Sequence, residues 1–580
     1  MSWAKVTWLS WGKEAFQKSK NQDIPILLDI SAVWCHWCHV MDQTTYSDVE
    51  VIKLIEEKFV PIRVDRDQRP DIDKRYNMGG WPTTVILTPE GNVITGTTYI
   101  PPQQMKNWLQ NISDFYKKNQ HQNIVKAKSK ELKRRTKKSS MPRNFNHEAL
   151  LSIIDDLTLK ITSNFDSMHG GFGSAPKFPH SEALALALLE HHIQGHKALL
   201  NIVKKTLHKM GQSGIYDKED GGFFRYSTTR DWSLPHYEKM CEDNAKLLVN
   251  YLQAFQATGE KEFKETARGI LEYVDTNLND QENGGFYGSQ DADEEYYKLN
   301  FLDRQKRTAP RIDKTLYTNW NAMMISAYLY ASVVLKDRSY LKTGLRALDF
   351  LLEKSFNHKN GMYHYYSNGV KQLSGLLSDQ IFMMKCLIDT YQTTADRQFI
   401  GFAESVAEFM LSNLWSGSEG FYDRPKDAHA LGFLRTIVIP FEENCAAIDA
   451  FLRLHYLTDK RNYIEVARKT LKHLASSYQR YGLLAAAYGL AIELYQRPMQ
   501  IHIVGSEKDR VVQKFLNESL KVYNPLKVVE ILDPVTDAQR LEGLKYPITD
   551  TPKAYVCFSG TCTAIERPEE IDKEVYLGLN

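Results

Sequence analysis

The sequence lacks several features that would each define a class of protein. In 580 residues, no apolar run approaches the roughly 20 residues that a membrane-spanning helix needs. The formal net charge is only +2, which argues against a nucleic-acid-binding surface over the whole protein. The first residues have no continuous apolar core of the kind found in signal peptides. We therefore expect a cytoplasmic protein that binds neither membrane nor nucleic acid.

Cysteine is also scarce. Seven cysteines in so long a chain do not make a disulfide scaffold, and an odd number leaves at least one of them unpaired. In a reducing compartment, a close cysteine pair is more often catalytic or metal-binding than structural. The sequence contains two close pairs, Cys35 with Cys38 and Cys557 with Cys562.

The pattern of apolar residues predicts four segments, because the chain is too long for a single hydrophobic core. Residues 1–118 alternate helix and strand signals, which predicts a compact α/β domain. Residues 119–146 are rich in lysine and arginine and predict a solvated linker, with a patch for an anionic partner as the alternative. Residues 147–496 are helical nearly throughout. Residues 497–580 return to alternation as a small α/β region, with a last strand at 553–558.

Loops that join glycine to an aromatic residue recur through the helical segment. They stand at Gly170–Gly173, Gly221–Phe224, Gly284–Tyr287, Gly361–His364 and Gly420–Asp423. Their spacing of roughly 50 to 80 residues fits one helical hairpin with an elaborated loop. Each hairpin alone exposes an apolar face, and closing six of them into an (α/α)6 toroid buries every such face. An open solenoid is the alternative, but its repeats are shorter and more regular.

The first cysteine pair stands in the motif Cys35-His36-Trp37-Cys38, between a strand signal and a helical segment. A thiolate at a helix N-terminus faces free backbone N–H groups and the positive end of the helix dipole, so the pKa of Cys35 should be lowered. His36 can add charge or a hydrogen bond and make the pair more oxidising. We predict that Cys35 is the nucleophile, nearer the helix end and the surface, and that Cys38 is the resolving thiol.

Two further residues fit thiol–disulfide chemistry. Asp29 lies on the strand before the motif, where a buried carboxylate can exchange a proton with Cys38. Pro82, after Trp81, precedes a strand at a place where a cis-proline commonly presents backbone to a disulfide substrate. Taken singly, Asp29 also fits a satisfied core carboxylate and Pro82 an edge proline.

The same stretch permits two other readings. With His39 it spells CxxCH, the attachment signature of c-type haem, but haem attachment generally requires export. Cys35, Cys38 and His39 are also zinc-ligand types, although a tetrahedral site needs a fourth ligand. We predict a redox pair with no metal and no cofactor, and zinc stays open as the alternative.

Several runs of sequence, spread over nearly the whole chain, occur together in one protein family. These runs are Trp34–Met41, Val64–Asp73, Gly79–Pro82, Gly170–Pro179, Pro235–Met240, Asp291–Asp293 and Trp320-Asn321. The chain resembles the spermatogenesis-associated protein 20-like family of thioredoxin-domain proteins. The resemblance implies a thioredoxin-like domain followed by a six-hairpin-glycosidase-type toroid, related in shape to N-acylglucosamine 2-epimerases. This chain departs from the family at Gln290, where the family has a glutamate.

The loops of the helical segment carry a second group of candidate residues. In a toroid the pocket lies at one end, where the loops between hairpins converge. Carboxylates, histidines and aromatic rings together suit a sugar, because rings stack on its faces and carboxylates bind its hydroxyls. The alternative is that these residues cap helices and brace loops. The candidates are His180, His236, Glu238, Asp243, Asp291, Asp293, Trp320 and Asp379.

We therefore hold three hypotheses for the function. The first is a thiol–disulfide oxidoreductase, whose partner is a disulfide-bearing protein substrate or a reductant. The second places sugar epimerisation or glycoside hydrolysis in the toroid, with a carbohydrate ligand and a regulatory thioredoxin-like domain. The third is a non-enzymatic, redox-sensitive adaptor. The predicted fold is multidomain: thioredoxin-like at the N-terminus, an (α/α)6 toroid in the centre, and a small C-terminal α/β segment.

Overall fold

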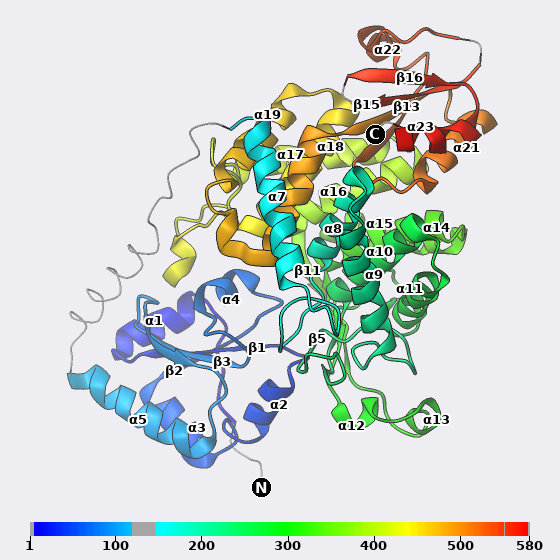
Figure 1. Cartoon of the computed structure of the whole chain (residues 1–580). Helices are drawn as coiled ribbons and strands as arrows, with labels where there is room; N and C mark the ends of the chain where they lie inside the picture. The colour runs from blue at the N-terminus through cyan, green and yellow to red at the C-terminus, as the bar shows by residue number, and fades with distance from the viewer. Residues whose placement is uncertain (1–4, 119–144, 550, 559, 578–580) are drawn as a thin grey trace. The chain divides into compact units, whose positions relative to one another are not determined.

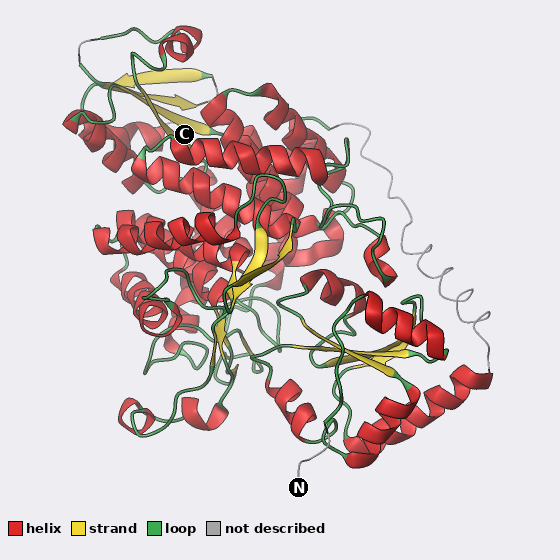
Figure 2. Cartoon of the chain, turned by 180° about the vertical axis from the view of Figure 1, so that it is seen from behind, coloured by secondary structure: helices red, strands yellow, loops and turns green. Residues whose placement is uncertain are grey.

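The computed structural model describes residues 5–118, 145–549, 551–558 and 560–577 (Figure 1). The chain is mixed α/β and mostly helical, as the sequence predicts (Figure 2). It divides into two compact units. The predicted basic linker, residues 119–146, lies almost wholly outside the described residues. Within the described residues, no helix combines the length and apolar character needed to cross a bilayer.

The first unit is built on a four-stranded sheet in the order β2-β1-β3-β4. Strands β1 and β2 are parallel, whereas β3 pairs antiparallel with both β1 and β4. Strand β1 is buried over five of its six residues, which explains its continuous apolar sequence. The elements of this unit are α1 (Lys13–Gln22), β1 (Ile26–Ser31), α2 (His36–Gln43), α3 (Val49–Lys58), β2 (Val60–Asp65), α4 (Pro70–Tyr76), β3 (Thr83–Leu87), β4 (Val93–Thr97) and α5 (Pro102–Lys118).

The same unit includes two later stretches of the chain, residues 291–294 and 423–438. The ring of Phe433 stacks on Tyr76 with centroids 5.1 Å apart, and the Phe433 backbone N–H donates to the Tyr76 hydroxyl. Arg75 forms a buried ion pair with Asp423 at 2.8 Å. The first unit is therefore not a contiguous piece of sequence.

The second unit contains a closed ring of helices. Among its described residues, six helices contact one another in the cyclic order α8, α10, α14, α16, α18, α20, and α20 returns to α8. These helices are α8 (Ser181–Gln194), α10 (Cys241–Thr258), α14 (Thr318–Val334), α16 (Leu377–Thr394), α18 (Phe441–Thr458) and α20 (Ala486–Gln496). Each also packs on an outer helix: α9 (Lys197–Gln212), α11 (Lys261–Tyr273), α15 (Arg338–Ser355), α17 (Gln398–Asn413), α19 (Arg461–Leu474) and, for α20, α7 (His147–Asn164).

Short elements connect the hairpins of this ring. They are η1 (Val274–Leu278), β5 (Tyr226–Ser227), β6 (Pro235–His236), β7 (Lys239–Met240), β8 (Ser289–Gln290), α12 (Glu294–Tyr297), α13 (Phe301–Arg304), β9 (Ile312–Asp313), β10 (Leu316–Tyr317), β11 (Tyr363–Ser367), β12 (Val370–Ser374) and η3 (Tyr478–Ala485). One further short element, η2 (Gly432–Arg435), belongs to the first unit.

Three of the five glycine-aromatic loops share one anchoring contact, an asparagine near the start of an inner helix. The side-chain amide of Asn244, near the start of α10, accepts from the Phe223 backbone N–H at 2.7 Å and donates to its carbonyl at 3.0 Å. Asn321 holds Phe286 in the same way, and so does Asn444 with Phe421. Because the amide satisfies both backbone groups of a buried residue, each loop is pinned to the next inner helix.

The C-terminal part of the second unit forms its own four-stranded sheet in the order β14-β13-β15-β16. Its apolar core combines strand residues such as Ile501 and Val529 with Phe515 of α21. The prediction of 553–558 as the last strand was wrong, because β16 and α23 follow it. The mostly exposed sequence Thr-Cys-Thr-Ala of β16 carries little apolar signal. The elements are β13 (Met499–Val504), α21 (Arg510–Lys521), β14 (Lys527–Leu532), α22 (Ala538–Leu544), β15 (Lys553–Phe558), β16 (Thr561–Ile565), η4 (Pro568–Glu570) and α23 (Ile571–Leu577).

Candidate functional site

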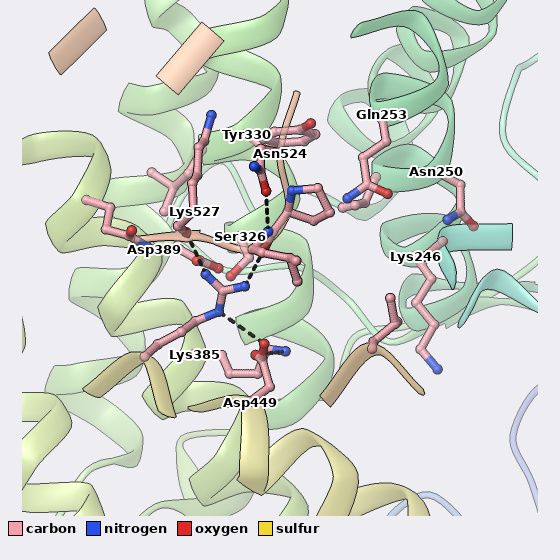
Figure 3. Close-up of a pocket in the computed structure, with 18 of the residues that line it drawn as sticks. Lys246, Asn250, Gln253, Ser326, Tyr330, Lys385, Asp389, Asp449, Asn524 and Lys527 are labelled. Carbon is pink, nitrogen blue, oxygen red and sulfur yellow. Dashed lines mark hydrogen bonds and ion pairs between the residues drawn. The ribbon is translucent and has the colours of Figure 1, made fainter. Parts of the chain in front are cut away.

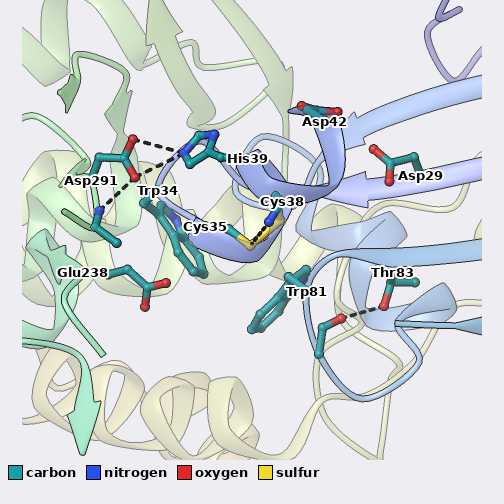
Figure 4. The surroundings of a disulfide bond; sticks show 12 residues. Asp29, Trp34, Cys35, Cys38, His39, Asp42, Trp81, Thr83, Glu238 and Asp291 are labelled. Carbon is teal, nitrogen blue, oxygen red and sulfur yellow. Dashed lines mark hydrogen bonds and ion pairs between the residues drawn. A yellow bond between two sulfur atoms is a disulfide. The ribbon is translucent and has the colours of Figure 1, made fainter. Parts of the chain in front are cut away.

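The motif cysteines lie where the chain passes from strand β1 into helix α2. Cys35 is the N-cap residue of α2, and it forms a disulfide with Cys38 one turn later (Figure 4). The backbone N–H of Cys38 donates to Sγ of Cys35 at 3.2 Å. The first sulfur therefore occupies the position at which free N–H groups of a helix stabilise negative charge.

The two sulfur-bearing residues are equally buried in this oxidised state. Cys35 and Cys38 are each 4% exposed, so Cys35 is nearer the helix end but not nearer the surface. The residues between them are exposed: His36 faces solvent and Trp37 is 47% exposed. The surface of the motif is therefore provided by an imidazole and an indole.

Two tryptophans lie beside the disulfide (Figure 4). The ring centroids of Trp34 and Trp81 are 5.9 Å apart in an edge-to-face arrangement. The indole of Trp34 donates to Asp67 at 2.6 Å, and that of Trp81 donates to Asp73 at 2.9 Å. Arg66 stacks over Trp81 at 4.6 Å. These contacts fix both indoles in place beside the sulfur atoms.

The predicted proline precedes strand β3. The peptide bond between Trp81 and Pro82 is cis, the isomer that the sequence analysis expects at this position. The role of Pro82 in presenting backbone to a disulfide substrate stays a prediction.

Asp29 is buried in the middle of β1, but the structure gives it partners that the sequence did not predict. Its carboxylate accepts from Arg63 Nε at 2.7 Å and from the Tyr46 hydroxyl at 3.1 Å. Burial raises the pKa of Asp29, and the nearby Arg63 guanidinium opposes that rise. Both carboxylate oxygens thus have a partner, and proton exchange with Cys38 stays a prediction.

Arg63 is the centre of a second group that the sequence analysis missed. Besides Asp29, its guanidinium binds Asp42 at 2.5 Å and stacks over Trp8 at 4.3 Å. The two carboxylates raise the pKa of Arg63, so it remains charged. The sequence offered one signal, because Arg63 interrupts the otherwise largely apolar strand β2. The structure adds that Arg63 stands opposite Asp29 on β1.

His39, in the first turns of α2, binds Asp291. Its Nε2 atom lies 3.0 Å from one carboxylate oxygen and 3.2 Å from the other (Figure 4). This hydrogen bond raises the pKa of His39. The structure thus places Asp291 and Asp293 in the first unit, apart from the helical-segment residues with which the sequence grouped them.

The other candidates of the helical segment lie at or near the starts of inner helices. Asp379, in the first turn of α16, lies 3.0 Å from His364 Nδ1, a partner that the sequence analysis did not name. His236 lies 2.9 Å from Glu238, which is only 1% exposed. Three further candidates occupy similar positions: His180 as the N-cap of α8, Asp243 in the first turn of α10, and Trp320 near the start of α14.

A cavity of about 420 Å³ lies among the inner helices, and none of the candidates predicted for a toroid pocket lines it (Figure 3). Its wall carries paired charges: Lys246 with Glu182 at 3.0 Å, and Asp449 with Lys385 at 2.6 Å. Asn250, which is 5% exposed, also lines the cavity, and its Oδ1 has no hydrogen-bond partner among the described residues. The wall is mostly apolar, with side chains such as Leu189 and Val249, and these few polar groups are placed to orient a small ligand.

Within the described residues, no group of three or more histidine, cysteine or acidic side chains is arranged to hold a metal ion. The arrangement at α2 supplies instead two sulfurs in contact, an exposed imidazole and a fixed aromatic surround. Chemically, it can exchange one disulfide for another.

Comparison with known proteins identifies a matching family model and a similar human protein. Residues 2–136 match the family model Thioredox_DsbH, described as "Protein of unknown function, DUF255". Spermatogenesis-associated protein 20 from Homo sapiens is 25% identical over 707 aligned residues, covering 98% of this chain and 90% of the human protein. The resemblance to the spermatogenesis-associated protein 20 family is confirmed. The N-terminal segment is accordingly thioredoxin-like, as in the matched family model.

Two further similarities concern enzymes of sugar chemistry. Cellobiose 2-epimerase from Bacteroides fragilis is 31% identical over 93 residues, which is 16% of this chain and 22% of that enzyme. The solved structure of cellobiose 2-epimerase from Spirochaeta thermophila DSM 6192 superposes with a TM-score of 0.45 and 16% identity, covering 57% of this chain and 86% of that one. A score this low does not establish a common fold, so the closed ring rests on the helix contacts of this chain.

Proposed function

We propose that the protein is a thiol–disulfide oxidoreductase that acts through Cys35 and Cys38. The observation that carries the proposal is the Cys35–Cys38 disulfide at the start of α2, with a backbone N–H of the helix directed at Cys35 Sγ. The thioredoxin-like family match over residues 2–136 supports it. A cytoplasmic location belongs to the same proposal.

In the reduced protein, the thiolate of Cys35 attacks one sulfur of a substrate disulfide, and the other substrate sulfur leaves as a thiolate. The thiolate of Cys38 then attacks Cys35 Sγ, which forms the intramolecular disulfide and releases the second substrate thiol. Two electrons and two protons pass from the protein dithiol to the substrate. An external dithiol reductant restores the starting state.

The neighbouring residues take supporting roles in this proposal. Asp29, whose pKa is raised by burial, accepts the proton of Cys38. The hydrogen bond from Arg63 holds the Asp29 carboxylate in position. His36 provides a hydrogen bond or positive charge near the thiolate. The backbone beside Pro82 binds the substrate chain. Exposed Trp37 gives an apolar contact for a protein partner, since aromatic residues are enriched in such interfaces.

The test is reduction of insulin disulfides by the full-length protein with dithiothreitol as the electron source. Cys35→Ser should abolish the catalysed rate, and reduced Cys38→Ser mixed with insulin after dithiothreitol has been removed should leave a mixed disulfide between Cys35 and insulin. Cys241→Ala is the matched control, because that thiol is buried and burial raises its pKa. Full activity in Cys35→Ser would refute the proposal.

A second candidate function is turnover or binding of a small carbohydrate in the helical ring, which we propose to be an (α/α)6 toroid. The cavity, with its charged side chains and the Asn250 Oδ1 atom that has no hydrogen-bond partner among the described residues, suits a small ligand that carries polar groups. The local similarity to a cellobiose 2-epimerase suggests a sugar. Epimerisation needs a base beside a carbon acid, a role for which His236 and Glu238 are the candidates.

Two sets of variants separate the possible locations of this activity. Calorimetry and NMR with cellobiose measure binding and epimerisation. Loss of both in Asn250→Leu alone places the ligand in the cavity, and loss in His236→Ala or Glu238→Gln places it at the helix starts. If wild-type protein neither binds nor converts sugars, the carbohydrate candidate fails. Partners trapped on Cys38→Ser without any turnover would instead favour the redox-sensitive adaptor.

A further inference from the structure

The C-terminal sheet repeats the topology of the first unit. Strand β13 is parallel to β14, and β15 is antiparallel to both β13 and β16, as β3 is to β1 and β4. Helix α21 lies between β13 and β14 in sequence, α22 precedes β15, and α23 follows β16. The chain therefore carries the strand order and directions of its thioredoxin-like sheet twice.

The second copy has its cysteines at a different place. The connection from β13 to α21, residues 505–509, contains no cysteine. Instead, Cys557 on β15 stands directly opposite Cys562 on β16, and the two form a disulfide. Cys557 is 8% exposed, whereas Cys562 faces solvent. Both side chains lie on the same face of the sheet, and Cys562 is the more accessible of the two.

A series of hydrogen bonds through Tyr546 and His502 leads to this disulfide. The hydroxyl of Tyr546 lies 3.0 Å from Cys557 Sγ and 3.5 Å from Cys562 Sγ. The same hydroxyl lies 2.9 Å from Nδ1 of His502 on β13. The tyrosine is held by Tyr555, whose ring stacks on it with centroids 3.9 Å apart.

The hydrogen bonds end at His502, and a buried carboxylate lies beyond it outside hydrogen-bond distance. His502 Nε2 lies 3.9 Å from a carboxylate oxygen of Glu530, which accepts from Arg540 at 2.8 Å. Burial lowers the pKa of His502 to about 4 and raises that of Glu530 to about 7. His502 is therefore neutral at pH 7, with one ring proton. With that proton on Nδ1, it donates to the Tyr546 oxygen and leaves the hydroxyl proton of Tyr546 for sulfur.

We infer that Cys557 and Cys562 form a second thiol–disulfide exchange site, in which an external thiolate attacks the exposed Cys562 and Tyr546 assists the departure of Cys557. The inference goes beyond the function proposed for Cys35 and Cys38 and does not require it. Its reaction partner is a thiol reductant, either a small dithiol or a pair of monothiols.

Reduction of this disulfide takes two successive thiol–disulfide exchanges. The attacking thiolate forms a bond to Cys562 Sγ, the Cys557–Cys562 bond breaks, and Cys557 leaves as a thiolate that accepts a hydrogen bond from Tyr546. A second thiolate of the reductant attacks the mixed disulfide and releases Cys562. The protein gains two electrons and two protons, and two reductant thiols become one disulfide.

A disulfide that only stabilises the fold would account for fewer of these observations than an exchange site does. Strands β15 and β16 already pair over five residues, and the cysteines are only five positions apart. The cross-link therefore closes a short loop, where the entropic gain is smallest. A cross-link that only stabilises the fold also does not require the hydroxyl of Tyr546 beside Cys557 Sγ.

The experiment uses the full-length Cys35→Ser/Cys38→Ser protein, so that failure of the first site cannot affect the result. The protein is equilibrated in glutathione buffers of varied ratio, quenched with acid, alkylated and analysed by peptide mass spectrometry. We expect Cys557 and Cys562 to change together from disulfide to dithiol within the range of cellular glutathione potentials. A pair that stays oxidised in excess dithiothreitol, or never forms in oxidised glutathione, overturns the inference.

Tyr546→Phe tests the role of the hydroxyl, with Tyr555→Phe as the matched control from the same ring stack. We expect Tyr546→Phe to slow reduction by dithiothreitol about fivefold, because the leaving thiolate loses its hydrogen bond. Tyr555→Phe should stay within about twofold of the parent, since that ring keeps its stacking. Equal rates in the parent and both variants would overturn the assignment of Tyr546, and a circular dichroism melt confirms that each variant is folded.

Discussion

At the scale of single residues, the candidate redox site depends on groups that hold charge in a buried setting. Arg63 joins Asp29 and Asp42 and lies over Trp8, so it neutralises a carboxylate in the core of the sheet. Removing one partner of a buried ion pair leaves an uncompensated charge, which costs more than the pair itself contributes. Arg63 is therefore expected to matter more than its partly exposed position suggests.

Arg63→Leu should lower the free energy of unfolding of the first unit by about 3 kcal/mol, because Asp29 remains buried without its cation. It should also raise the pKa of Asp29 further. Urea unfolding followed by tryptophan fluorescence measures the change. Asp42→Asn is the control, since Asp42 is 42% exposed and its loss should cost less than about 1 kcal/mol. Equal costs for the two variants would contradict this account of Arg63.

The sequence was sufficient to predict site residues that belong to a local motif. It was not sufficient to predict contacts between residues that only folding brings together. Cys35, Cys38 and the proline after Trp81 are recognisable because a helix start and a strand start stand beside them in the chain. The contact of His39 with Asp291 joins residues 252 positions apart, and no period or spacing indicates it. The bonds of Trp34 to Asp67 and of Trp81 to Asp73 were also missed, because they depend on how the chain folds and belong to no sequence motif.

At the scale of elements, two inner helices bring carboxylates together. Glu190 of α8 is fully buried, and burial followed by repulsion from Glu493 of α20 raises its pKa to about 8. The pKa of Glu493 is also raised by burial, and Arg497 lies 3.3 Å from its carboxylate. The contact between α8 and α20, which closes the ring, is therefore sensitive to protonation.

The pH dependence has a definite sign. The folded-state pKa of Glu190 is raised above its unfolded value, so its contribution to stability is fully present below about pH 4.3 and is lost as the pH rises through about 8. Glu190→Gln should therefore stabilise the helical unit at pH 8 by on the order of 2 kcal/mol and have little effect at pH 4. Thermal unfolding at both pH values measures this.

The matched control for that prediction is Glu265→Gln, whose side chain is 63% exposed. Its midpoint should not change at either pH. If Glu190→Gln destabilised the protein at pH 8, the assignment of a raised pKa to this contact would be wrong.

Element boundaries followed the sequence closely where periodicity was strong. The alternation of helix and strand predicted over residues 1–118 is present, with strands such as β2 (Val60–Asp65) and β3 (Thr83–Leu87). The edge strand β16 escaped prediction because exposure on an edge removes the alternation that indicates a strand. The inclusion of residues 423–438 in the first unit also escaped it, because a packing partner so far along the chain leaves no local signal.

At the scale of the whole molecule, the chain combines a thioredoxin-like sheet, a closed helical ring and a second sheet of the same topology. The ring was predictable from its repeated glycine-aromatic loops, and anchoring asparagines for three of them recur on α10, α14 and α18. The repeat of the sheet was not, because the second copy lacks the motif cysteines at its helix start. For the first sheet, we propose that the Cys35 thiol at the start of α2 is more acidic than an ordinary cysteine and exchanges its disulfide reversibly.

The most direct test is the alkylation rate of Cys35 as a function of pH in the reduced, full-length Cys38→Ser protein, read by peptide mass spectrometry. A helix N-terminus that stabilises the thiolate predicts a half-maximal rate below about pH 7.5, at least one unit under that of an ordinary cysteine. A half-maximal rate at or above about pH 8.5 would show an ordinary thiol and would contradict the account.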